Sequence, residues 1–428
     1  MEDKDKFIIE TTRQVLGRLV AQLEQEKYWQ VHGDFQTAMR RLTAELTREL
    51  GPELGTEANA VYLQVVDLVS RLGWYGPIHH AMSEKEITDI RINSPYRPFL
   101  FIKEGKKHEM PVKVSSEWIR YIVTGFRRQR NLGAAGLPVK CTGAVARPPM
   151  RYTFVSGIFG VGGDSLYIRK FRRYPLKLID QIETGVLTPE AADFLDMAVK
   201  ARLNLIVSGG SNAGKTTLLT TLALSIPRAE RVVTVEDEHE IYLEESELKD
   251  FLPFELNREE QPATDMSELL RNVALKVAPD RVIVGEVRGK EAYDLMQAMN
   301  IGVDGSMATL HANSPADALT KLADYVMMSD NPPPLEIIYS RIAAQHPLVV
   351  QISLLPDGKR MVTGIAECLS TSKTTFETQQ LFVVENGRLW RTRTPYSQFL
   401  AARIAPIKEL LEVKRSRVSR IEPAPQKG

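Results

Sequence analysis

The chain has 428 residues, of which 43% are hydrophobic and 25% are charged, a composition typical of a globular protein with two or three domains. Its 55 Lys and Arg residues nearly balance 54 Asp and Glu residues, and the net charge of +1 excludes a global attraction to nucleic acid or acidic membranes. Only two cysteines occur, Cys141 and Cys368, and they form no C-x-x-C pair. This scarcity excludes a zinc module and predicts a reducing compartment.

No stretch of the sequence is long and apolar enough to span a bilayer, and the opening residues do not read as a signal peptide. We therefore expect a cytoplasmic protein. Any basic surface that binds a polyanion has to be local, because the chain as a whole is almost neutral.

Residues 1–76 carry apolar side chains at helical spacing and predict three amphipathic helices that form a small bundle. Breaks at Gly33–Asp34 and Gly51–Pro52 separate the helices. The apolar stripes are expected to make the core of this bundle, and the alternative is a surface that binds a partner. They comprise Ile8, Val15, Leu16, Leu19 and Leu23, then Phe35, Met39, Leu42, Leu46 and Leu50, then Val61, Val65, Leu68 and Leu72.

Residues 77–171 predict a smaller, strand-rich α/β domain. Polar and apolar side chains alternate over Asp89–Ile92, which is the two-residue period of a half-buried strand. One helix is expected around Trp118–Phe126, because its apolar residues share one face. The following segment, 172–187, predicts a linker between domains.

Strands and helices alternate from Thr188, a helix-capping residue before Pro189, to about residue 413, and this alternation predicts a parallel sheet covered on both faces. Turn signals at Pro356–Gly358 and Glu385–Gly387 predict hairpins near the end. Residues 414–428 are basic and then Pro-rich, and predict a disordered tail. The expected strands are Leu203–Ser208, Arg231–Glu236, Arg281–Gly285 and Gly305–His311, and the expected helices follow the first strand and lie around Leu269–Lys276 and Glu291–Met299.

A glycine-rich segment in the middle of the chain fits the nucleotide P-loop pattern G-x-x-x-x-G-K-[ST], between a predicted strand and a predicted helix. Glycines let backbone N–H groups turn toward phosphates, and the amino terminus of the helix adds a favourable dipole. Lys215 is then expected on the β- and γ-phosphates of ATP and Thr216 on Mg²⁺. The predicted nucleotide-binding residues are Gly209, Gly210, Ser211, Asn212, Ala213, Gly214, Lys215, Thr216 and Thr217.

Hydrolysis of a nucleotide also needs a carboxylate that orients or deprotonates water and a group that completes the metal shell. In a doubly wound sheet such groups stand at the carboxyl ends of strands, beside the P-loop. Three predicted strand ends deliver them: Glu236 with Glu240, Glu286 with Arg288, and His311. Each of these residues, taken singly, also fits a polar cap at the end of a strand.

Four short segments stand out in the second half of the chain: 209–217, Val235–Asp237, Pro279–Gly289 and Asp304–Ser314. In this order they resemble the Walker A, Asp, Walker B and His boxes of the type II/type IV secretion ATPases. The similarity continues upstream through Glu86–Ile90 and Ser165–Phe171, so it covers most of the chain after the leading helices. Within that group, the last two boxes are most similar to the tight-adherence (Flp/Tad) pilus branch.

The resemblance implies a cytoplasmic homo-hexamer that hydrolyses ATP to power pilus assembly or secretion. It implies an α/β chain in which a RecA-like P-loop motor domain, 188–413, follows the smaller α/β domain and the helical bundle, with ATP between the two α/β domains. An inner-membrane platform protein is the implied partner and would hold the ATPase at the membrane periphery. Neither zinc nor sequence-specific nucleic acid is expected.

Carried over by position, the resemblance also gives roles to single residues. Lys215 binds phosphate, and His311 senses the phosphate or lies beside it. Glu286 attends Mg²⁺ and water, while Glu236 and Glu240 are both left open as the general base. The expected metal ligands are Thr216, Glu286 and Glu236. Arginines of the smaller domain are expected to face the nucleotide and neutralise charge on its γ-phosphoryl group, namely Arg147, Arg151 and Arg169.

The chain departs from the family pattern in several places, and two of them bear on the nucleotide site. The usual Gly-Ser of the P-loop is Asn212–Ala213 here, and Asn tolerates left-handed backbone angles, so the cradle is still expected to form. Lys276 and Ala278 stand where relatives commonly carry arginines, so a bidentate donor is lost before the Walker B strand.

Three other functions stay open on sequence alone. The same motor fits a conjugative type IV secretion machine, and the departures from the family pattern fit a nucleotide-gated structural ring with weak hydrolysis. A nucleic-acid motor of the recombinase type shares the core, but the neutral charge and the lack of a basic, aromatic groove disfavour it. The substrate and the direction of work are also open.

Overall fold

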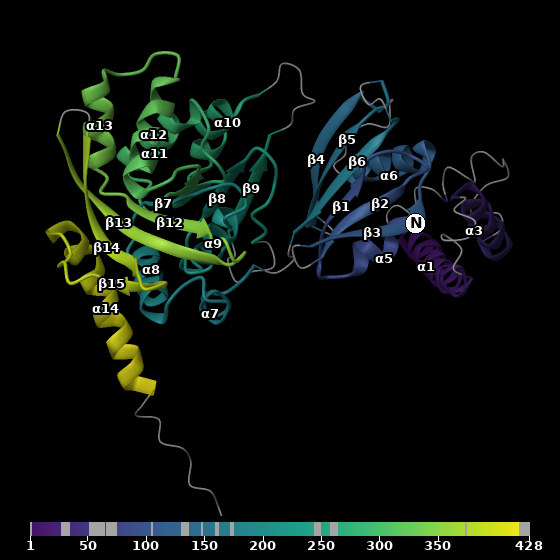
Figure 1. The fold of residues 1–428 in the computed structure, drawn as a ribbon, viewed down its shortest axis with the longest axis horizontal. Coiled ribbons are helices and arrows are strands. Elements are labelled where there is room, and N and C mark those ends of the chain that lie inside the picture. The colour runs from purple at the N-terminus through teal and green to yellow at the C-terminus, as the bar shows by residue number, and fades with distance from the viewer. Residues whose placement is uncertain are drawn as a thin grey trace, which may run out of the picture. The chain divides into compact units, whose positions relative to one another are not determined.

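In a computed structural model the chain forms two compact units, Met1–Arg172 and Arg173–Gly428 (Figure 1). The structure describes residues 2–26, 35–50, 65, 75–103, 106–129, 137–146, 149–158, 162–171, 175–243, 250–256, 264–372 and 375–418. The division into five segments that the sequence predicts is finer than these two units, and it stays a prediction.

The first unit joins helices to a six-stranded antiparallel sheet with the strand order β3-β2-β1-β6-β5-β4. Its long helices α1 and α3 lie where the sequence predicts them, but the third predicted helix falls outside the described residues except for Val65. The elements are α1 (Glu2–Gln25), α3 (Phe35–Leu50), η2 (Gly76–Ile78), α5 (His79–Ser83), β1 (Ile87–Ile92), β2 (Pro98–Lys103), β3 (Lys106–Lys113), α6 (Ser116–Gln129), β4 (Lys140–Ala146), β5 (Pro149–Val155) and β6 (Ser165–Lys170).

One face of this sheet carries the apolar residues of the first core. Alternation places Ile90 and Ile168, which are register partners on β1 and β6, among the buried residues. The helix α6 adds Trp118 and Phe126, and the ring of Phe126 lies 5.1 Å from that of Tyr152 on β5. The apolar stripes of α1 and α3 belong to the same hydrophobic cluster, so the leading helices share their core with the sheet.

The second unit is built on a nine-stranded sheet with the order β15-β14-β13-β12-β7-β11-β10-β8-β9. The strands from β12 to β9 run parallel, and β13, β14 and β15 continue from β12 as an antiparallel meander. The elements are α7 (Leu178–Glu183), α8 (Pro189–Lys200), β7 (Leu205–Gly209), α9 (Lys215–Ala223), β8 (Val232–Glu236), β9 (Phe251–Glu255), α10 (Met266–Asn272), η3 (Ala274–Val277), β10 (Arg281–Val284), α11 (Glu291–Asn300), β11 (Met307–Leu310), α12 (Pro315–Met327), α13 (Leu335–Ala343), β12 (Leu348–Leu354), β13 (Arg360–Ser372), β14 (Thr375–Glu385), β15 (Arg388–Arg391) and α14 (Gln398–Val418).

Two hydrophobic clusters cover the two faces of this sheet, as the alternation of elements predicts. Residues of α8, α9 and α14 pack on one face, and residues of α10 to α13 pack on the other (Figure 1). Successive residues of β7 divide between the clusters, because Leu205 and Val207 face the first and Ile206 faces the second. The α/β fold class is therefore confirmed.

Several predicted boundaries match the structure. Thr188 is the N-cap of α8, and its hydroxyl accepts a hydrogen bond from the Ala191 N–H. The turn at Pro356–Gly358 joins β12 to β13, and the turn at Glu385–Gly387 joins β14 to β15. In the part of the chain that the structure describes, no helix combines the length and hydropathy of a membrane span.

Two predicted irregular segments contain helix. The segment 172–187 holds α7, because the Asp180 carboxylate accepts a hydrogen bond from the Lys177 N–H and Ile182 packs against the core. The segment 414–428 begins inside α14, which continues to Val418; the residues after it lie outside the described range.

Candidate functional site

The P-loop joins β7 to α9 at the carboxyl edge of the parallel strands. Two of its residues have left-handed backbone angles, Asn212 with φ +59° and Gly214 with φ +97°. Gly209 lies so close to β12 that a Cβ on it would be 2.2 Å from the carbonyl oxygen of Ile352. The closeness of β12 thus requires glycine at position 209. The left-handed backbone angle at position 212 requires a residue that tolerates it, such as Asn.

Lys215 is the first residue of α9, and only 8% of it is exposed. Its Nζ donates a hydrogen bond to the carbonyl oxygen of Gly210 at 3.1 Å, so the ammonium lies under the loop. Burial lowers the pKa of Lys215, and the carboxylates of Glu286 and Glu240 oppose this shift. A lysine enclosed in this way is suited to neutralise a phosphate brought into the loop.

His311 connects the P-loop lysine to the acid that follows β10. Its Nδ1 lies 3.2 Å from Lys215 Nζ, and its Nε2 lies 2.8 Å from Glu286 Oε1. The Glu286 carboxylate also accepts a hydrogen bond from the Arg288 guanidinium. Burial and the Lys215 charge lower the pKa of His311 below 6.5, although Glu286 opposes them. A neutral imidazole with its proton on Nε2 can accept at Nδ1 from the Lys215 ammonium, while the approach of Nε2 to Glu286 Oε1 lacks the alignment of a hydrogen bond.

Glu236 and Glu240 have different surroundings, although they are only four positions apart in the sequence. Glu236 is 2% exposed, its Oε2 lies 2.8 Å from His239 Nδ1, and its Oε1 accepts the backbone N–H groups of Glu240 and Ile241, both at 3.0 Å. The carboxylate of Glu236 therefore holds the loop after β8. Glu240 is half-buried, and its charge acts on Lys215.

Thr216 and Glu286 supply oxygen donors of the kind that Mg²⁺ prefers. Glu286 Oε1 is a buried acceptor that takes no well-aligned hydrogen bond from any described residue, and Thr216 lies in the first turn of α9. These two residues fit a magnesium ion that shares its shell with phosphate oxygens. The third predicted ligand, Glu236, has both oxygens engaged by its own loop. Over the described ranges, no group of three or more His, Cys, Asp or Glu side chains forms a metal cage.

Two residues at the site were not anticipated from the sequence. Gln351, buried in β12, accepts a hydrogen bond from the Ser208 hydroxyl and donates one to the carbonyl oxygen of Ala312 at 3.1 Å. Arg360, at the start of β13, donates from Nε to the carbonyl oxygen of Asn212 at 3.0 Å. Neither belongs to a recognised box, and only the pairing of β12 with β7 brings them to the P-loop.

The predicted arginines of the first unit have three different outcomes. Arg147 lies outside the described residues. Arg151 on β5 is the cross-strand neighbour of Arg169 on β6. Arg169 donates from Nε to Asp89 at 3.1 Å, and its role toward a nucleotide stays a prediction. Burial opposes ionisation of Asp89, but hydrogen bonds from Thr88, Tyr167 and Arg169 outweigh it and hold the pKa of Asp89 below its usual range.

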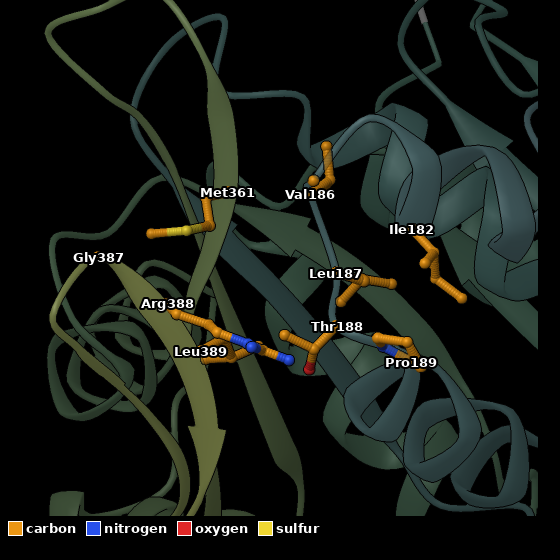
Figure 2. Close-up of a pocket in the computed structure, with 10 residues that line it drawn as sticks. Ile182, Val186, Leu187, Thr188, Pro189, Met361, Gly387, Arg388 and Leu389 are labelled. Carbon is orange, nitrogen blue, oxygen red and sulfur yellow. The ribbon is translucent and has the colours of Figure 1, made fainter.

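A separate cavity of 220 Å³ lies in the second unit, between the α7–α8 connection and the meander (Figure 2). Its lining is mainly apolar and includes Leu187 and Met361, while Arg388 extends toward Thr188 across it. None of its lining residues belongs to the P-loop or the strand-end acids, so this cavity does not match a site for a polyphosphate.

Residues 150–399, more than half of the chain, match the family described as Type II/IV secretion system protein. The chain belongs to this family. The resemblance inferred from the four boxes is thereby confirmed at family level, whereas the narrower assignment to the tight-adherence branch stays a prediction.

Curated relatives match parts of the chain. A putative conjugal transfer protein of Mycobacterium tuberculosis is 32% identical over 204 residues, which cover 48% of this chain and 57% of that protein. The type IV secretion system protein PtlH of Bordetella pertussis is 36% identical over 160 residues, or 37% of this chain and 47% of PtlH. An uncharacterized protein of Methanocaldococcus jannaschii is 41% identical over 155 residues, or 35% of this chain and 21% of that protein. The chain thus spans between a fifth and three fifths of the length of these relatives.

Two solved structures share the architecture. The Legionella pneumophila ATPase DotB superposes with a TM-score of 0.51 at 17% identity, covering 73% of this chain and 82% of DotB. The pilus retraction motor PilT with bound ADP also gives a TM-score of 0.51, at 15% identity, covering 80% of this chain and 89% of PilT. These likenesses support the α/β fold.

Proposed function

We propose that the protein is a secretion-family ATPase that binds ATP with Mg²⁺ at the P-loop and hydrolyses it. The observation that carries this proposal is the convergence of Lys215, Glu286 and His311. Lys215 Nζ lies 3.2 Å from His311 Nδ1, and His311 Nε2 lies 2.8 Å from Glu286 Oε1. A buried cation and a carboxylate beside a glycine loop are the parts that phosphoryl transfer requires.

In this proposal each side chain has a separate task. Lys215 would exchange the carbonyl oxygen of Gly210 for phosphate oxygens, and Thr216 and Glu286 would hold the metal. Bound Mg²⁺ would supply charge neutralisation on the phosphates. His311 stays neutral, orients the Glu286 carboxylate and keeps Lys215 directed at the phosphates. Neutrality matters, because a second cation here would repel the lysine.

We assign the general base to Glu240 rather than to Glu236. Glu236 is enclosed and its two oxygens are engaged by His239 and by backbone N–H groups. A carboxylate that accepts these contacts is held away from water. Glu240 lies at the same strand end, is half-buried, and acts electrostatically on Lys215. It is therefore the acid that can reach a water beside the phosphates.

The proposed output is work on a type IV or Flp/Tad pilus or on a secretion machine in the inner membrane. The proposed assembly is a cytoplasmic homo-hexamer, recruited to the membrane by an inner-membrane platform protein. A conjugative type IV secretion ATPase is the second candidate, supported by the relatives described as conjugal transfer proteins. Pilin genes beside the gene favour the first assignment, and relaxase genes favour the second.

Steady-state turnover of ATP by the purified full-length protein tests the proposal. We expect magnesium-dependent hydrolysis by the wild-type protein and little by Glu286→Gln. Equal, negligible rates for both proteins, together with retained ATP binding, would favour the nucleotide-gated structural ring. Capture of the intact protein from membranes, with identification of what it binds, tests the platform partner.

A further inference from the structure

Arg360 crosses the P-loop from the neighbouring hairpin. It is the first residue of β13 and follows the Pro356–Gly358 turn that leaves β12. Its Nε donates to the carbonyl oxygen of Asn212 at 3.0 Å. Its Cδ is the atom nearest to the place where a Cβ on Gly214 would lie, at 3.0 Å. The side chain thus covers Gly214 and holds the carbonyl two residues before it.

The held carbonyl belongs to a residue with an unusual conformation. Asn212 has φ +59°, in the left-handed region that L-residues other than Asn and Asp rarely occupy. In a trans peptide the carbonyl and the following N–H point in opposite directions. A hydrogen bond that fixes the Asn212 carbonyl on the Arg360 side therefore turns the Ala213 N–H to the other side.

The other side is the interior of the loop. The Ala213 N–H donates to the carbonyl oxygen of Gly210 at 3.4 Å, and Lys215 Nζ donates to the same oxygen at 3.1 Å. The two donors converge on one acceptor, as they must to share a phosphate group. The orientation of the Asn212–Ala213 peptide thus decides whether the backbone joins the lysine in that task.

We propose that Arg360 is a positioning residue for nucleotide binding, which orients the Asn212–Ala213 peptide so that the Ala213 N–H faces the phosphates. Asn212 is the residue that replaces the usual glycine of this loop, and Arg360 stabilises the peptide plane that follows it. The inference rests on the proposed function, because it assumes that the P-loop receives a nucleoside polyphosphate.

The chemistry of the side chain supplies a matched pair of variants. The Nε2 of Gln is as many bonds from the backbone as the Nε of Arg, so Arg360→Gln keeps a donor at this distance without the charge. The side chain of Met is as long as that of Gln and has no donor, so Arg360→Met removes the hydrogen bond. The neighbouring Lys359 points its ammonium to Asp357 at 3.5 Å, so Lys359→Ala removes one exposed charge without touching the loop.

Calorimetry with Mg-ADP on the full-length protein is the test, with melting temperatures measured in the absence of nucleotide. For Arg360→Met we expect binding about fivefold weaker, which corresponds to one lost hydrogen bond, with an unchanged melting temperature. Arg360→Gln should retain most of the affinity, and Lys359→Ala should match the wild type. In ATP turnover, KM should rise in the variant whose affinity falls, and kcat should change little.

Three results would overturn the inference. Equal losses for the Gln and Met variants would mean that charge alone acts at position 360. Wild-type affinity in Arg360→Met would mean that the peptide needs no support, and it would leave the proposed function intact. No binding of Mg-ADP or Mg-ATP by the wild-type protein would overturn the proposed function and this inference together.

Discussion

Lys215 Nζ and His311 Nδ1 lie 3.2 Å apart, although 96 residues separate them in the sequence. The pairing of β7 with β11 produces this contact, because the strands run parallel and end side by side. His311 then carries the connection on to Glu286. The imidazole of His311 therefore contacts both the P-loop lysine, Lys215, and the acid that follows β10, Glu286, without a bound nucleotide.

Lys215→Ala should abolish productive nucleotide binding. The variant removes the buried ammonium that sits under the loop, and we expect kcat/KM to fall by about 100-fold or more. Lys359→Ala is the control, since it removes an exposed lysine outside the P-loop and leaves the buried ammonium in place. A loss of about tenfold or less in kcat/KM is what the removal of a single hydrogen bond to a charged group causes. A loss that small in the Lys215 variant would contradict the assigned role.

The pH dependence of turnover should reflect His311. Burial and Lys215 lower the pKa of His311 below 6.5, so the imidazole is neutral at neutral pH and becomes charged only as the pH falls further. Protonation adds a cation beside Lys215 and removes the acceptor at Nδ1. We therefore expect kcat/KM to decline below pH 6.5, and His311→Gln to lose this part of the decline.

A profile for the His311→Gln variant that keeps the same acidic limb would assign that limb to another group. A limb that lies above pH 6.5 in the wild type would mean that the imidazole is charged in the working state, against the shift that its surroundings cause.

Exchanging Glu236, the last residue of β8, and Glu240 each for its amide should separate catalysis from folding. Glu240→Gln is expected to lower kcat by about 100-fold or more with nearly unchanged nucleotide binding and melting temperature. Glu236→Gln keeps one acceptor but weakens the contact with His239, so it should cost about 1–3 kcal/mol of stability. Turnover and thermal unfolding of the two variants, measured side by side, check this assignment. The opposite pattern would make Glu236 the base.

Gln351 should contribute to both stability and turnover. Gln351→Leu leaves the buried Ser208 hydroxyl and the Ala312 carbonyl without their partner, and we expect a loss of about 1–3 kcal/mol. Because Ala312 follows His311, kcat should fall as well. Adding Ser208→Ala should restore part of the stability and none of the turnover, and a double variant no more stable than Gln351→Leu would argue against the bridge.

The opposite edge of the sheet offers a matched pair of glycines. Arg281 is fully buried and pairs with Glu230, and a Cβ on Gly305 would lie 1.8 Å from its Nη1. Gly302 also has positive φ, but nothing lies within 4 Å of its Cβ position. Gly302→Ala should cost about 1–2 kcal/mol from backbone strain alone. Gly305→Ala should cost clearly more in thermal unfolding, and equal losses would mean that Arg281 moves freely.

Most of the candidate site in the second unit could be predicted because its residues lie in short, recognisable sequence motifs. The P-loop, its flanking strand and helix, and the three strand ends each occupy a short run of sequence. Glu286 and His311 could therefore be assigned to one edge from topology alone. The roles of Glu236 and Glu240 could not be separated, because burial and hydrogen bonding distinguish them and neither property follows from spacing.

The missed features depend on contacts between distant segments. Gln351 meets Ser208 across 143 residues and Arg360 meets Asn212 across 148, through the insertion of β12 beside β7. The strand β9 and the helices α12 and α13 were not predicted either, because they lie outside the four boxes. The helix α7 was hidden by Pro175, which reads as a break although the helix starts three residues later.

The contact between Gly209 and Ile352 limits which inactive alleles are informative. Any side chain at position 209 would clash with the backbone of β12. Loss of activity in such a variant would therefore reflect a distorted fold and not a specific loss of phosphate binding. An experiment that needs a folded but inactive protein should therefore alter Lys215 or Glu286 and leave Gly209 unchanged.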